Sequence, residues 1–499
     1  MPELSDWAAS TPDALALIAP AGTRTFAQLD GNANRLAHAL RARGLVAGDA
    51  VALIAGNHPA FVETVYACQR AGYRLTPVNW HLTADEASYI VDDCEAKALI
   101  ATIDVADVAR GCLANAPACK VAIVAGGDVE GFERFEDALA GESDEPLPDP
   151  SPGSTMLYTS GTTGRPKGVH RPAGATTIRA VNVGGHESGD VHLCTGPLYH
   201  AAPLAFSLSI PLAFGATVVL MDQWDAERTL QLIEEHGVTH THMVPTMFHR
   251  LLSLPDDVRN RYDVSTLRYV LHGAAPCPVP VKRRMIEWLG PIVWEYYAAT
   301  EGVGSFVDSQ TWLAHPGTVG KPFLDDQVIV GDEEGTRLPA REIGLVYIRS
   351  PEAARFTYFK DQEKTASSFR GEYFTLGDVG YLDEEGFLYL TDRSANLIIS
   401  GGVNIYPAEV DAALLEHPAV ADVAVIGVPD DEWGEAVLGV VELKDDVDPS
   451  DALAAELIEH CRVRLAHYKC PRRIEFVASL PREDNGKIYK RRLRDAYRA

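Results

Sequence analysis

The chain has 499 residues, of which 46% are hydrophobic and 23% are charged. This length exceeds what one hydrophobic core organises, so we expect at least two domains of an ordinary folded protein. The formal net charge of −26 argues against nucleic acid, and against an anionic membrane surface, as the main partner.

The cysteines and the apolar windows are typical of a cytoplasmic protein without stable membrane insertion. None of the eight cysteines forms a C-x-x-C pair, which indicates reduced thiols. The N-terminus lacks the basic-then-apolar pattern of a signal peptide. The most apolar window, residues 204–220, is interrupted by Pro211 and Gly215 and is too short for a membrane span.

Short apolar runs alternate with helical patterns along the first three hundred residues. The strand-like runs lie at 50–56, 97–103, 120–126, 217–221 and 268–271, and the helical patterns at 59–72, 226–236 and 279–289. This alternation predicts βαβ units, and therefore an α/β fold with mostly parallel sheets covered by helices. A break near residues 391–402 separates this part from a shorter α+β pattern.

The stretch YTSGTTGRPKGV, residues 158–169, combines glycines, hydroxyl groups and a lysine. Glycines let backbone N–H groups approach an anion closely, and the lysine adds a positive charge. The spacing is not that of a Walker A loop, because Gly168 follows the lysine where that motif has Ser or Thr. The stretch predicts a phosphate-binding loop, and an ordinary flexible loop is the alternative.

The charge is distributed unevenly. Residues 461–499 carry twelve Lys or Arg against four Asp or Glu, a net charge of +8 in an acidic protein. This segment is either a solvated basic tail or a platform for an anionic ligand.

Four further segments follow the glycine-rich loop in a fixed order. They are EYYAATEG (295–302), FTLGDVGYLD (374–383), TDRSANLIISGGVNIYPAEV (391–410) and LPREDNGKIYKRRL (480–493). Together the five segments, which run along essentially the whole chain, resemble the adenylate-forming superfamily of acyl-CoA synthetases, luciferases and peptide-synthetase adenylation domains. The resemblance implies an N-terminal domain over 1–392, a hinge over 393–396 and a mobile C-terminal lid over 397–499.

The resemblance also implies a reaction in which ATP converts a carboxylate into acyl-AMP before a thiol displaces AMP. The charge of the departing pyrophosphate must then be neutralised and the α-phosphate stabilised. The implied pyrophosphate-binding residues are Thr159, Ser160, Gly161, Thr162, Thr163, Gly164 and Lys167. Thr300 is implied as the α-phosphate contact, and Glu301 as the ligand of Mg²⁺, a hard cation that prefers oxygen.

Three more segments are implied to hold the nucleoside. Tyr297 would stack on adenine, and the backbone of Gly273, Ala274 and Ala275 would line the base. Asp378 would accept hydrogen bonds from both ribose hydroxyls, and Arg393 would share the ribose. Ala298 stands where family members often have glycine, which affects the fit around the base. The alternatives are that Asp378 is a turn residue and that Tyr297 belongs to the core.

The C-terminal motifs are implied to serve both half-reactions. Lys487 would reach the carboxylate and the α-phosphate during adenylation and leave when the lid rotates, whereas Lys490 is expected to be a screened surface charge. The implied coenzyme A contacts are Gly401 and Gly402, beside the pantetheine path, and the basic residues Arg462 and Arg473. Ala395 stands in the hinge where the family commonly has Lys or Asp, so the balance between lid positions is in question.

The stretch 195–215 bears on the acid that is activated. No acidic residue lies between Leu198 and Met221, and an uncompensated buried ammonium group is costly, so an amino acid is disfavoured. The predicted acyl-pocket residues are His200, Val244, His272, Ala298 and Ala299. His200 is either a pocket gate or a packed core histidine. The i,i+2 spacing of His240 and His242 suits one face of a strand better than a zinc site.

The sequence therefore predicts an ATP-dependent acyl-CoA ligase for an apolar acid, with either a fatty or a bulky or cyclic acyl group. ATP, Mg²⁺ and coenzyme A are the expected cofactors and co-substrates. A stand-alone adenylase that loads an acyl carrier protein is the alternative, since it would share every nucleotide motif. A luciferase-like oxygenase or a catalytically silent relative is disfavoured because Lys487, Glu301 and the loop are all present. The sequence does not indicate the oligomeric state.

Overall fold

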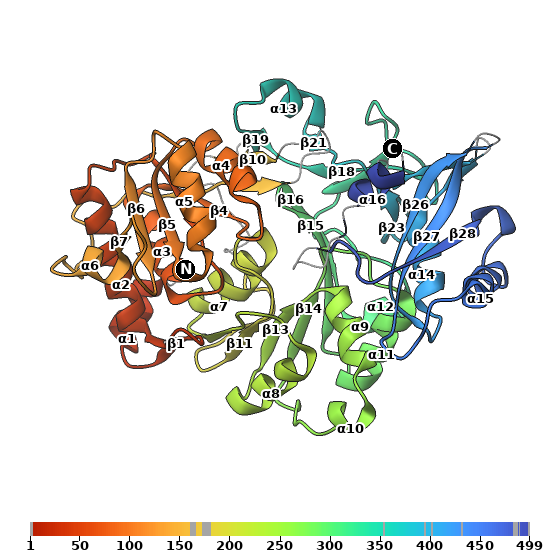
Figure 1. Ribbon diagram of the computed structural model, residues 1–499, viewed down its shortest axis with the longest axis horizontal. Helices are drawn as coiled ribbons and strands as arrows, with labels where there is room; N and C mark the ends of the chain where they lie inside the picture. The colour runs from red at the N-terminus through yellow and green to blue at the C-terminus, as the bar shows by residue number, and fades with distance from the viewer. Residues whose placement is uncertain are drawn as a thin grey trace.

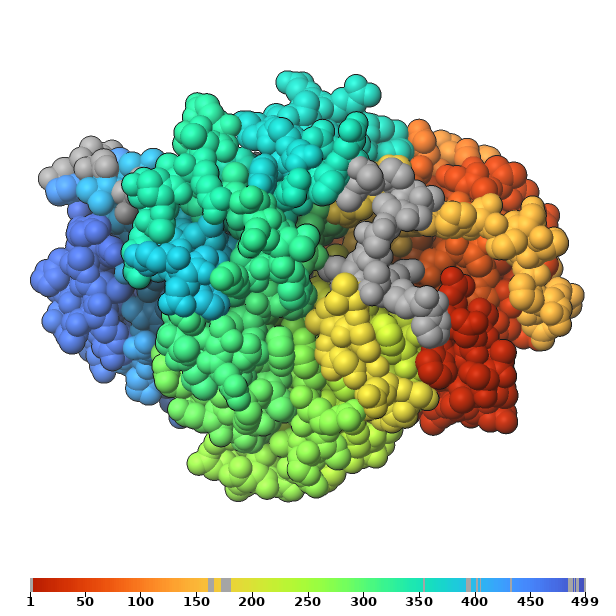
Figure 2. Space-filling view, turned by 180° about the vertical axis from the view of Figure 1, so that it is seen from behind, coloured from red at the N-terminus to blue at the C-terminus, as the bar shows by residue number. Residues whose placement is uncertain are grey.

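The computed structural model describes residues 3–159, 166–171, 181–352, 355–393, 396–400, 403–430, 433–482, 488 and 490–497. Its strands form five sheets (Figure 1). The red and orange N-terminal segment and the blue C-terminal segment lie on opposite sides of the molecule, with the middle of the chain between them (Figure 2).

The first large sheet is entirely parallel, in the order β7-β6-β5-β3-β4-β8. Its strands are β3 (Ala50–Ile54), β4 (Arg74–Val78), β5 (Ala96–Thr102), β6 (Val121–Ala125), β7 (Glu133–Arg134) and β8 (Ser154–Thr155), and its helices are α2 (Phe26–Ala42), α3 (Pro59–Ala71), α4 (Ala84–Asp93), α5 (Ala106–Asn115) and α6 (Phe135–Leu139). Every residue of β3 is buried, as expected for a parallel strand covered on both faces. Helix α3 begins with Pro59 and ends at Gly72, whose φ of +77° favours glycine.

The second large sheet has the order β16-β15-β14-β13-β11-β12-β1-β2, and its neighbours from β15 to β1 are parallel. The strands are β1 (Leu15–Ile18), β2 (Arg24–Thr25), β11 (Val191–Cys194), β12 (Thr217–Leu220), β13 (His240–Met243), β14 (Tyr269–His272), β15 (Val293–Ala299) and β16 (Gly302–Val307), and the helices are α1 (Leu4–Ser10), the π-helix Pro203–Ser209, α7 (Ile210–Ala213), α8 (Ala226–His236), α9 (Pro245–Ser253), α10 (Asp256–Arg259), α11 (Val279–Leu289) and α12 (Ser309–Ala314). The carboxyl ends of β11, β13, β14 and β15 share one edge, which is where open α/β sheets bind ligands.

Two smaller antiparallel sheets stand next to that edge. One joins β9 (Leu157–Thr159), β10 (Lys167–His170) and β19 (Thr357–Tyr358) in the order β19-β10-β9. The other contains β17 (Val328–Gly331), β18 (Gly344–Arg349), β20 (Phe369–Arg370), β21 (Tyr373–Phe374), β22 (Asp378–Leu382) and β23 (Leu388–Arg393), and α13 (Gln362–Ser368) lies between β19 and β20 in the chain. The three-stranded sheet therefore connects the glycine-rich segment to residues almost two hundred positions later.

The C-terminal part forms its own sheet and core. The strands are β24 (Ile398–Ser400), β25 (Val403–Ile405), β26 (Val420–Asp430), β27 (Gly434–Leu443) and β28 (Arg473–Val477), with α14 (Pro407–Leu415), α15 (Asp451–Arg462) and α16 (Lys490–Tyr497). Ile398, Val410, Val425 and Leu457 belong to one buried cluster that contains only residues after 397. The predicted boundary and the hinge at Ala395, which lies outside the described residues, stay predictions.

The cysteines are unpaired in this fold. All eight are free, seven of them are buried, and Cys277 is half-buried. Burial raises the pKa of Cys194, the last residue of β11, to about 12. The same cause raises the pKa of Cys112 and Cys119 to about 11.

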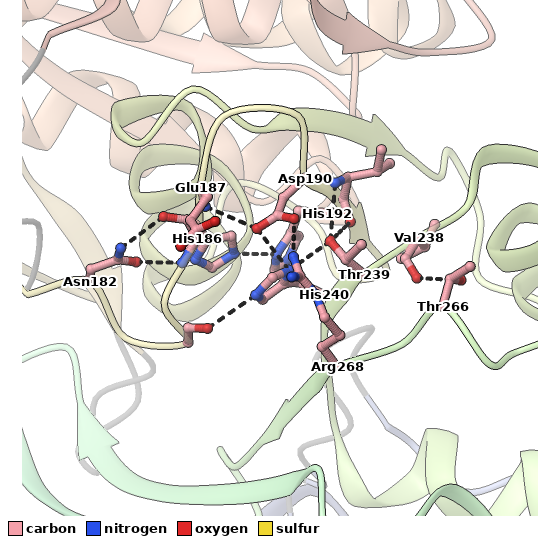
Figure 3. A network of polar contacts seen from close by, with 12 residues as sticks. Asn182, His186, Glu187, Asp190, His192, Val238, Thr239, His240, Thr266 and Arg268 are labelled. Atoms are coloured by element: carbon pink, nitrogen blue, oxygen red, sulfur yellow. Dashed lines mark hydrogen bonds and ion pairs between the residues drawn. The ribbon is translucent and has the colours of Figure 1, made fainter.

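A buried histidine cluster occupies the amino ends of β11 and β13 (Figure 3). His186 Nε2 lies 3.1 Å from His192 Nδ1, and the ring of His186 stacks on that of His240 with 4.1 Å between centroids. Asp190 accepts a hydrogen bond from Arg268 and lies 3.8 Å from His240 Nδ1. Burial lowers the pKa of His186 to about 3 and holds that of His192 well below its ordinary value.

This cluster should make the protein sensitive to acid. Above pH 6.5 these histidines are neutral in both the folded and the unfolded chain. Below that pH the unfolded chain protonates them, whereas the folded chain keeps them neutral. The free energy of unfolding therefore falls as the pH falls from 6.5 toward 3, by at most about 1.4 kcal/mol per pH unit for each histidine. Thermal unfolding measured between pH 7.5 and pH 4.5 should show His192→Gln losing stability less steeply than wild type. The exposed His81→Gln should keep the wild-type slope, and equal slopes in all three proteins would contradict this expectation.

Candidate functional site

The stems of the predicted phosphate loop are held in register by the three-stranded sheet. Across the hairpin, Thr159 pairs with Lys167, and on the other side of β10, Val169 pairs with Tyr358. The Tyr158 hydroxyl donates to Asp93 at 2.5 Å, which ties the first stem to α4. The predicted pyrophosphate residues Ser160, Gly161, Thr162, Thr163 and Gly164 lie outside the described residues.

Lys167 is engaged by a carboxylate. Its Nζ lies 2.6 Å from Asp361 Oδ2, and Asp361 also caps α13 by accepting a hydrogen bond from Lys364 N at 2.9 Å. The lysine and this backbone donor hold the pKa of the Asp361 carboxyl below its ordinary value. Sequence reasoning missed Asp361, for which the only signal was an aspartate at the start of a short helical segment.

Thr300 and Glu301 form the turn between β15 and β16. Glu301 is buried, and its Oε1 accepts a hydrogen bond from the Tyr358 hydroxyl at 3.0 Å. Burial and the adjacent carboxylate raise the pKa of Tyr358, so it remains a neutral donor. A buried carboxylate that accepts a hydrogen bond from Tyr358 is an oriented hard oxygen ligand, and Glu301 therefore fits the chemistry of Mg²⁺.

The predicted nucleoside residues lie on or directly after four strands, β14, β15, β22 and β23. Gly273 follows β14, and a Cβ there would lie 2.6 Å from both the ring and the carbonyl oxygen of Tyr296, so only glycine fits. Ala274 has a φ of +67°, an uncommon conformation for a residue with a side chain. The Tyr297 hydroxyl donates to Asp378 Oδ2 at 2.7 Å, which joins the predicted adenine and ribose contacts. In the backbone register of β22 and β23, Asp378 lies opposite Arg393.

The predicted acyl residues are placed in two environments. Val244 follows β13, and Ala298 and Ala299 end β15, all at the carboxyl edge of the sheet. Ala298 packs in a cluster with Phe206, Tyr296 and Phe306. His200 is half-buried beside Tyr199, with 4.3 Å between ring centroids.

His272 lies instead in a packed layer beneath α9 and α11. It is fully buried, its ring meets Phe248 edge-on at 4.9 Å, and its Nε2 lies 3.6 Å from Glu295 Oε2. Glu295 Oε2 also accepts from the buried Lys282 Nζ at 2.6 Å, and this ammonium lies 4.7 Å from the centre of the Trp312 ring. Sequence reasoning missed this buried ion pair, because the two residues lie on different elements.

The C-terminal domain contains a pocket with two arginines, each of which has an acidic partner: Arg472 lies 3.7 Å from Asp430, which also lines the pocket, and Arg473 lies 2.8 Å from Glu475. Its volume is about 400 Å³, and Arg472, Arg473 and Tyr497 are among the residues that line it. The Arg472 guanidinium also lies 4.9 Å from the centre of the half-exposed Trp433 ring. Arg462, at the end of α15, is exposed and pairs with Glu459 at 3.3 Å. Gly401 and Gly402 lie outside the described residues.

The segment that carries Lys487 also lies outside the described residues, but its flanks are anchored. Arg482 forms an ion pair with Asp422 and pairs with Ile488 in a β-bridge. The expectation for Lys490 is wrong. This lysine is buried, with its Nζ 2.6 Å from Asp411 Oδ2, because it begins α16, which packs against β26.

Comparisons with known proteins agree with this arrangement. The family profile "AMP-binding enzyme" matches residues 4–358, and the profile "AMP-binding enzyme C-terminal domain" matches residues 409–487. A feruloyl-CoA synthase of Amycolatopsis sp is 35% identical over 94% of this chain and 93% of its own length. A fatty acid–[acyl-carrier-protein] ligase of Streptomyces coeruleorubidus is 33% identical over 97% of this chain and 94% of its own.

A solved structure also has a similar fold over almost the whole chain. The crystal structure of an anthranilate CoA ligase in complex with anthranoyl-AMP has a TM-score of 0.89 and 28% identity, covering 99% of this chain and 96% of its own. Fold and site thus define a two-domain adenylate-forming enzyme. The chain belongs to the AMP-binding enzyme family and is an AMP-forming acyl-CoA synthetase that uses ATP and CoA. The expected family and α/β fold are confirmed.

Within the described ranges, the structure has neither a membrane-spanning helix nor a cluster of metal-binding side chains. No helix there is long and apolar enough to cross a membrane. In the same residues, no group of three or more His, Cys, Asp or Glu side chains is arranged to hold a metal ion. His240 belongs to the histidine cluster, and His242 Nε2 lies 3.0 Å from the Tyr296 hydroxyl.

Proposed function

We propose that the enzyme activates an apolar monocarboxylic acid, with a fatty or a bulky or cyclic acyl group, and transfers it to coenzyme A. The observation that carries this proposal is the uncharged aromatic cluster beside Ala298. The ring of Phe206 lies 4.8 Å from that of Tyr296 and 6.3 Å from that of Phe306. The adjacent His242 is buried with its pKa lowered to about 3, so it is neutral. The members of this buried cluster and the adjacent His242 offer no charge to pair with the ammonium group of an amino acid.

In the first half-reaction, the acid's carboxylate attacks the α-phosphate of ATP and pyrophosphate leaves. Tyr297 and the backbone from Gly273 to Ala275 would hold the base, and Asp378 with Arg393 the ribose. The β9–β10 loop would hold the leaving pyrophosphate, and Thr300 the α-phosphate. Mg²⁺ bound at Glu301 would supply positive charge toward the phosphates. Lys487 would follow the charge that moves from the carboxylate to the α-phosphate.

In the second half-reaction, the lid would turn and bring its pocket toward the thiol substrate. Arg472 and Arg473 offer cations to phosphate groups, and the indole of Trp433 offers a stacking surface to a purine. Together they suit the nucleotide end of coenzyme A. Arg462, Gly401 and Gly402 would contribute along the same path.

A stand-alone adenylase that loads a carrier protein is the second candidate. The similarity to a fatty acid–[acyl-carrier-protein] ligase favours it. The basic C-terminal segment would also attract an acidic protein. The two candidates differ only in the acceptor of the acyl group.

A panel of acids with Mg²⁺-ATP tests the proposal. We expect AMP and pyrophosphate from aromatic, cyclic or medium-to-long fatty acids, with an acyl-CoA formed when CoA is present. Free α-amino acids should support no ATP–pyrophosphate exchange. Products of ADP and phosphate, or efficient exchange with any α-amino acid, would contradict the proposal. Turnover that needs a phosphopantetheinylated carrier protein in place of CoA would favour the second candidate.

A further inference from the structure

Arg171, the residue after β10, contacts the turn that carries Thr300 and Glu301. Its Nη1 donates to the carbonyl oxygen of Thr300 at 2.9 Å, and its Nη2 donates to the carbonyl oxygen of Glu301. The guanidinium also lies 5.9 Å from the centre of the Phe356 ring, one strand away. One side chain therefore fixes two consecutive peptide groups.

The guanidinium is partly buried and bonds neutral partners. Burial lowers the pKa of Arg171, and the Glu301 charge acts against this shift. Among the residues that the structure describes, no carboxylate lies within ion-pair distance of its nitrogens. A cation removed from water without a direct counter-ion is costly to hold, and an anion bound nearby would offset that cost.

The two sides of the turn are held by different elements of the same small sheet. Arg171 holds the backbone from β10, and Tyr358 of β19 holds the Glu301 carboxylate at 3.0 Å. Four residues before Arg171, Lys167 ends the glycine-rich loop on the same strand. Strand β10 is thus a short, direct connection between the phosphate loop and the Thr300–Glu301 turn.

We propose that Arg171 is a positioning residue, which orients the Thr300–Glu301 peptide relative to the phosphate loop. The proposal rests on the roles of Thr300 and Glu301 in the proposed function. With both carbonyls turned toward Arg171, the Thr300 hydroxyl and the Glu301 carboxylate keep a fixed spacing to the triphosphate. A displacement of about 1 Å at such a site can cost about 10²-fold in rate.

The test compares Arg171→Met and Arg171→Lys with Arg355→Met. Arg355 is a matched control, because it donates to the Gly371 carbonyl at 2.6 Å and lies 5.0 Å from the Phe369 ring centre, without contact to residues 300–301. Three quantities are measured for each protein: the rate of ATP–pyrophosphate exchange, the affinity for Mn²⁺ in the presence of a non-hydrolysable ATP analogue, and the unfolding temperature.

We expect Arg171→Met to lower exchange by about 10²-fold and to weaken Mn²⁺ binding about tenfold, the effect of losing a group that orients a metal ligand. Arg171→Lys keeps the positive charge but not the two guanidinium nitrogens that contact both carbonyl oxygens. Its exchange rate and its Mn²⁺ affinity should therefore lie between those of Arg171→Met and wild type. Arg355→Met should match wild type in both measurements. Unchanged Mn²⁺ affinity in either Arg171 variant, or an equal loss in Arg355→Met, would overturn the proposal. If Arg171→Met does not fold, Arg171→Lys decides alone. Absence of exchange in wild-type protein with every acid would instead refute the proposed function.

Discussion

Replacing Lys487 with alanine should slow acyl-AMP formation by about 10²–10³-fold, the range for losing one preorganised electrostatic contact. A lysine ammonium is a localised and rotatable charge, suited to following the charge that develops on the α-phosphate. Its contribution should therefore appear in the rate rather than in substrate binding. ATP–pyrophosphate exchange measures this half-reaction. When synthetic acyl-AMP and CoA are supplied, the variant should form thioester at nearly the wild-type rate, because the proposed rotation of the lid would by then have moved Lys487 away from the site.

The control for this experiment must be an exposed cation of the same domain. Lys490 is unsuitable, because its buried ion pair with Asp411 makes a substitution there a test of lid stability. Arg464 is exposed and pairs with Glu416 at 2.9 Å on the surface. Arg464→Gln should change the adenylation rate by less than about twofold, since exposed pairs contribute little. Equal losses in both half-reactions of Lys487→Ala would refute the rotating lid for this protein.

The second large effect concerns stability. Lys282→Met should destabilise the folded protein by about 3–5 kcal/mol, because it leaves a buried charge without its partner. The side chain of Lys282 has no exposed surface and that of Glu295 only 6%, and 2.6 Å separates Nζ from Oε2. Burial already raises the pKa of Glu295, and the lysine opposes that shift. Chemical denaturation, followed by tryptophan fluorescence, measures the change.

Two variants show whether this loss comes from the unpaired charge. The double variant Lys282→Met with Glu295→Leu should recover most of the stability, because apolar residues of similar volume often replace a buried ion pair at little cost. Arg349→Gln removes one partner of an exposed pair with Glu372, at 2.8 Å, and should change stability by less than about 1 kcal/mol. A Lys282→Met protein no less stable than Arg349→Gln would contradict the expectation.

The periodic parts of the chain could be predicted from the sequence, because local pattern determines them. The apolar runs at 50–56, 97–103 and 120–126 correspond to β3, β5 and β6. The residues that support the site could not be predicted in this way. Asp361 lies 194 positions from Lys167, and Arg171 lies 129 positions from Thr300, so only the folded sheet brings them together.

The same limit explains the mistake over Lys490. A run of cations near the end of a chain is usually solvated, and nothing local shows that α16 packs against β26 and Asp411. Tyr358 likewise carries no local signal, because its role depends on the pairing of β19 with β10. The sequence therefore contains motifs for the proposed nucleotide contacts, but no local signal for the residues that hold those motifs in place.

The buried thiols have a consequence for chemical selectivity. An acyl-AMP is an acylating agent that any thiolate in reach could attack, so the protein's own cysteines compete in principle with coenzyme A. Cys194 lies at the carboxyl edge of the second sheet, but burial raises its pKa to about 12. The shift makes the thiolate, which is the nucleophile, scarce at neutral pH. The hydrophobic core thus protects the enzyme from acylating itself and leaves the activated acid to the incoming thiol.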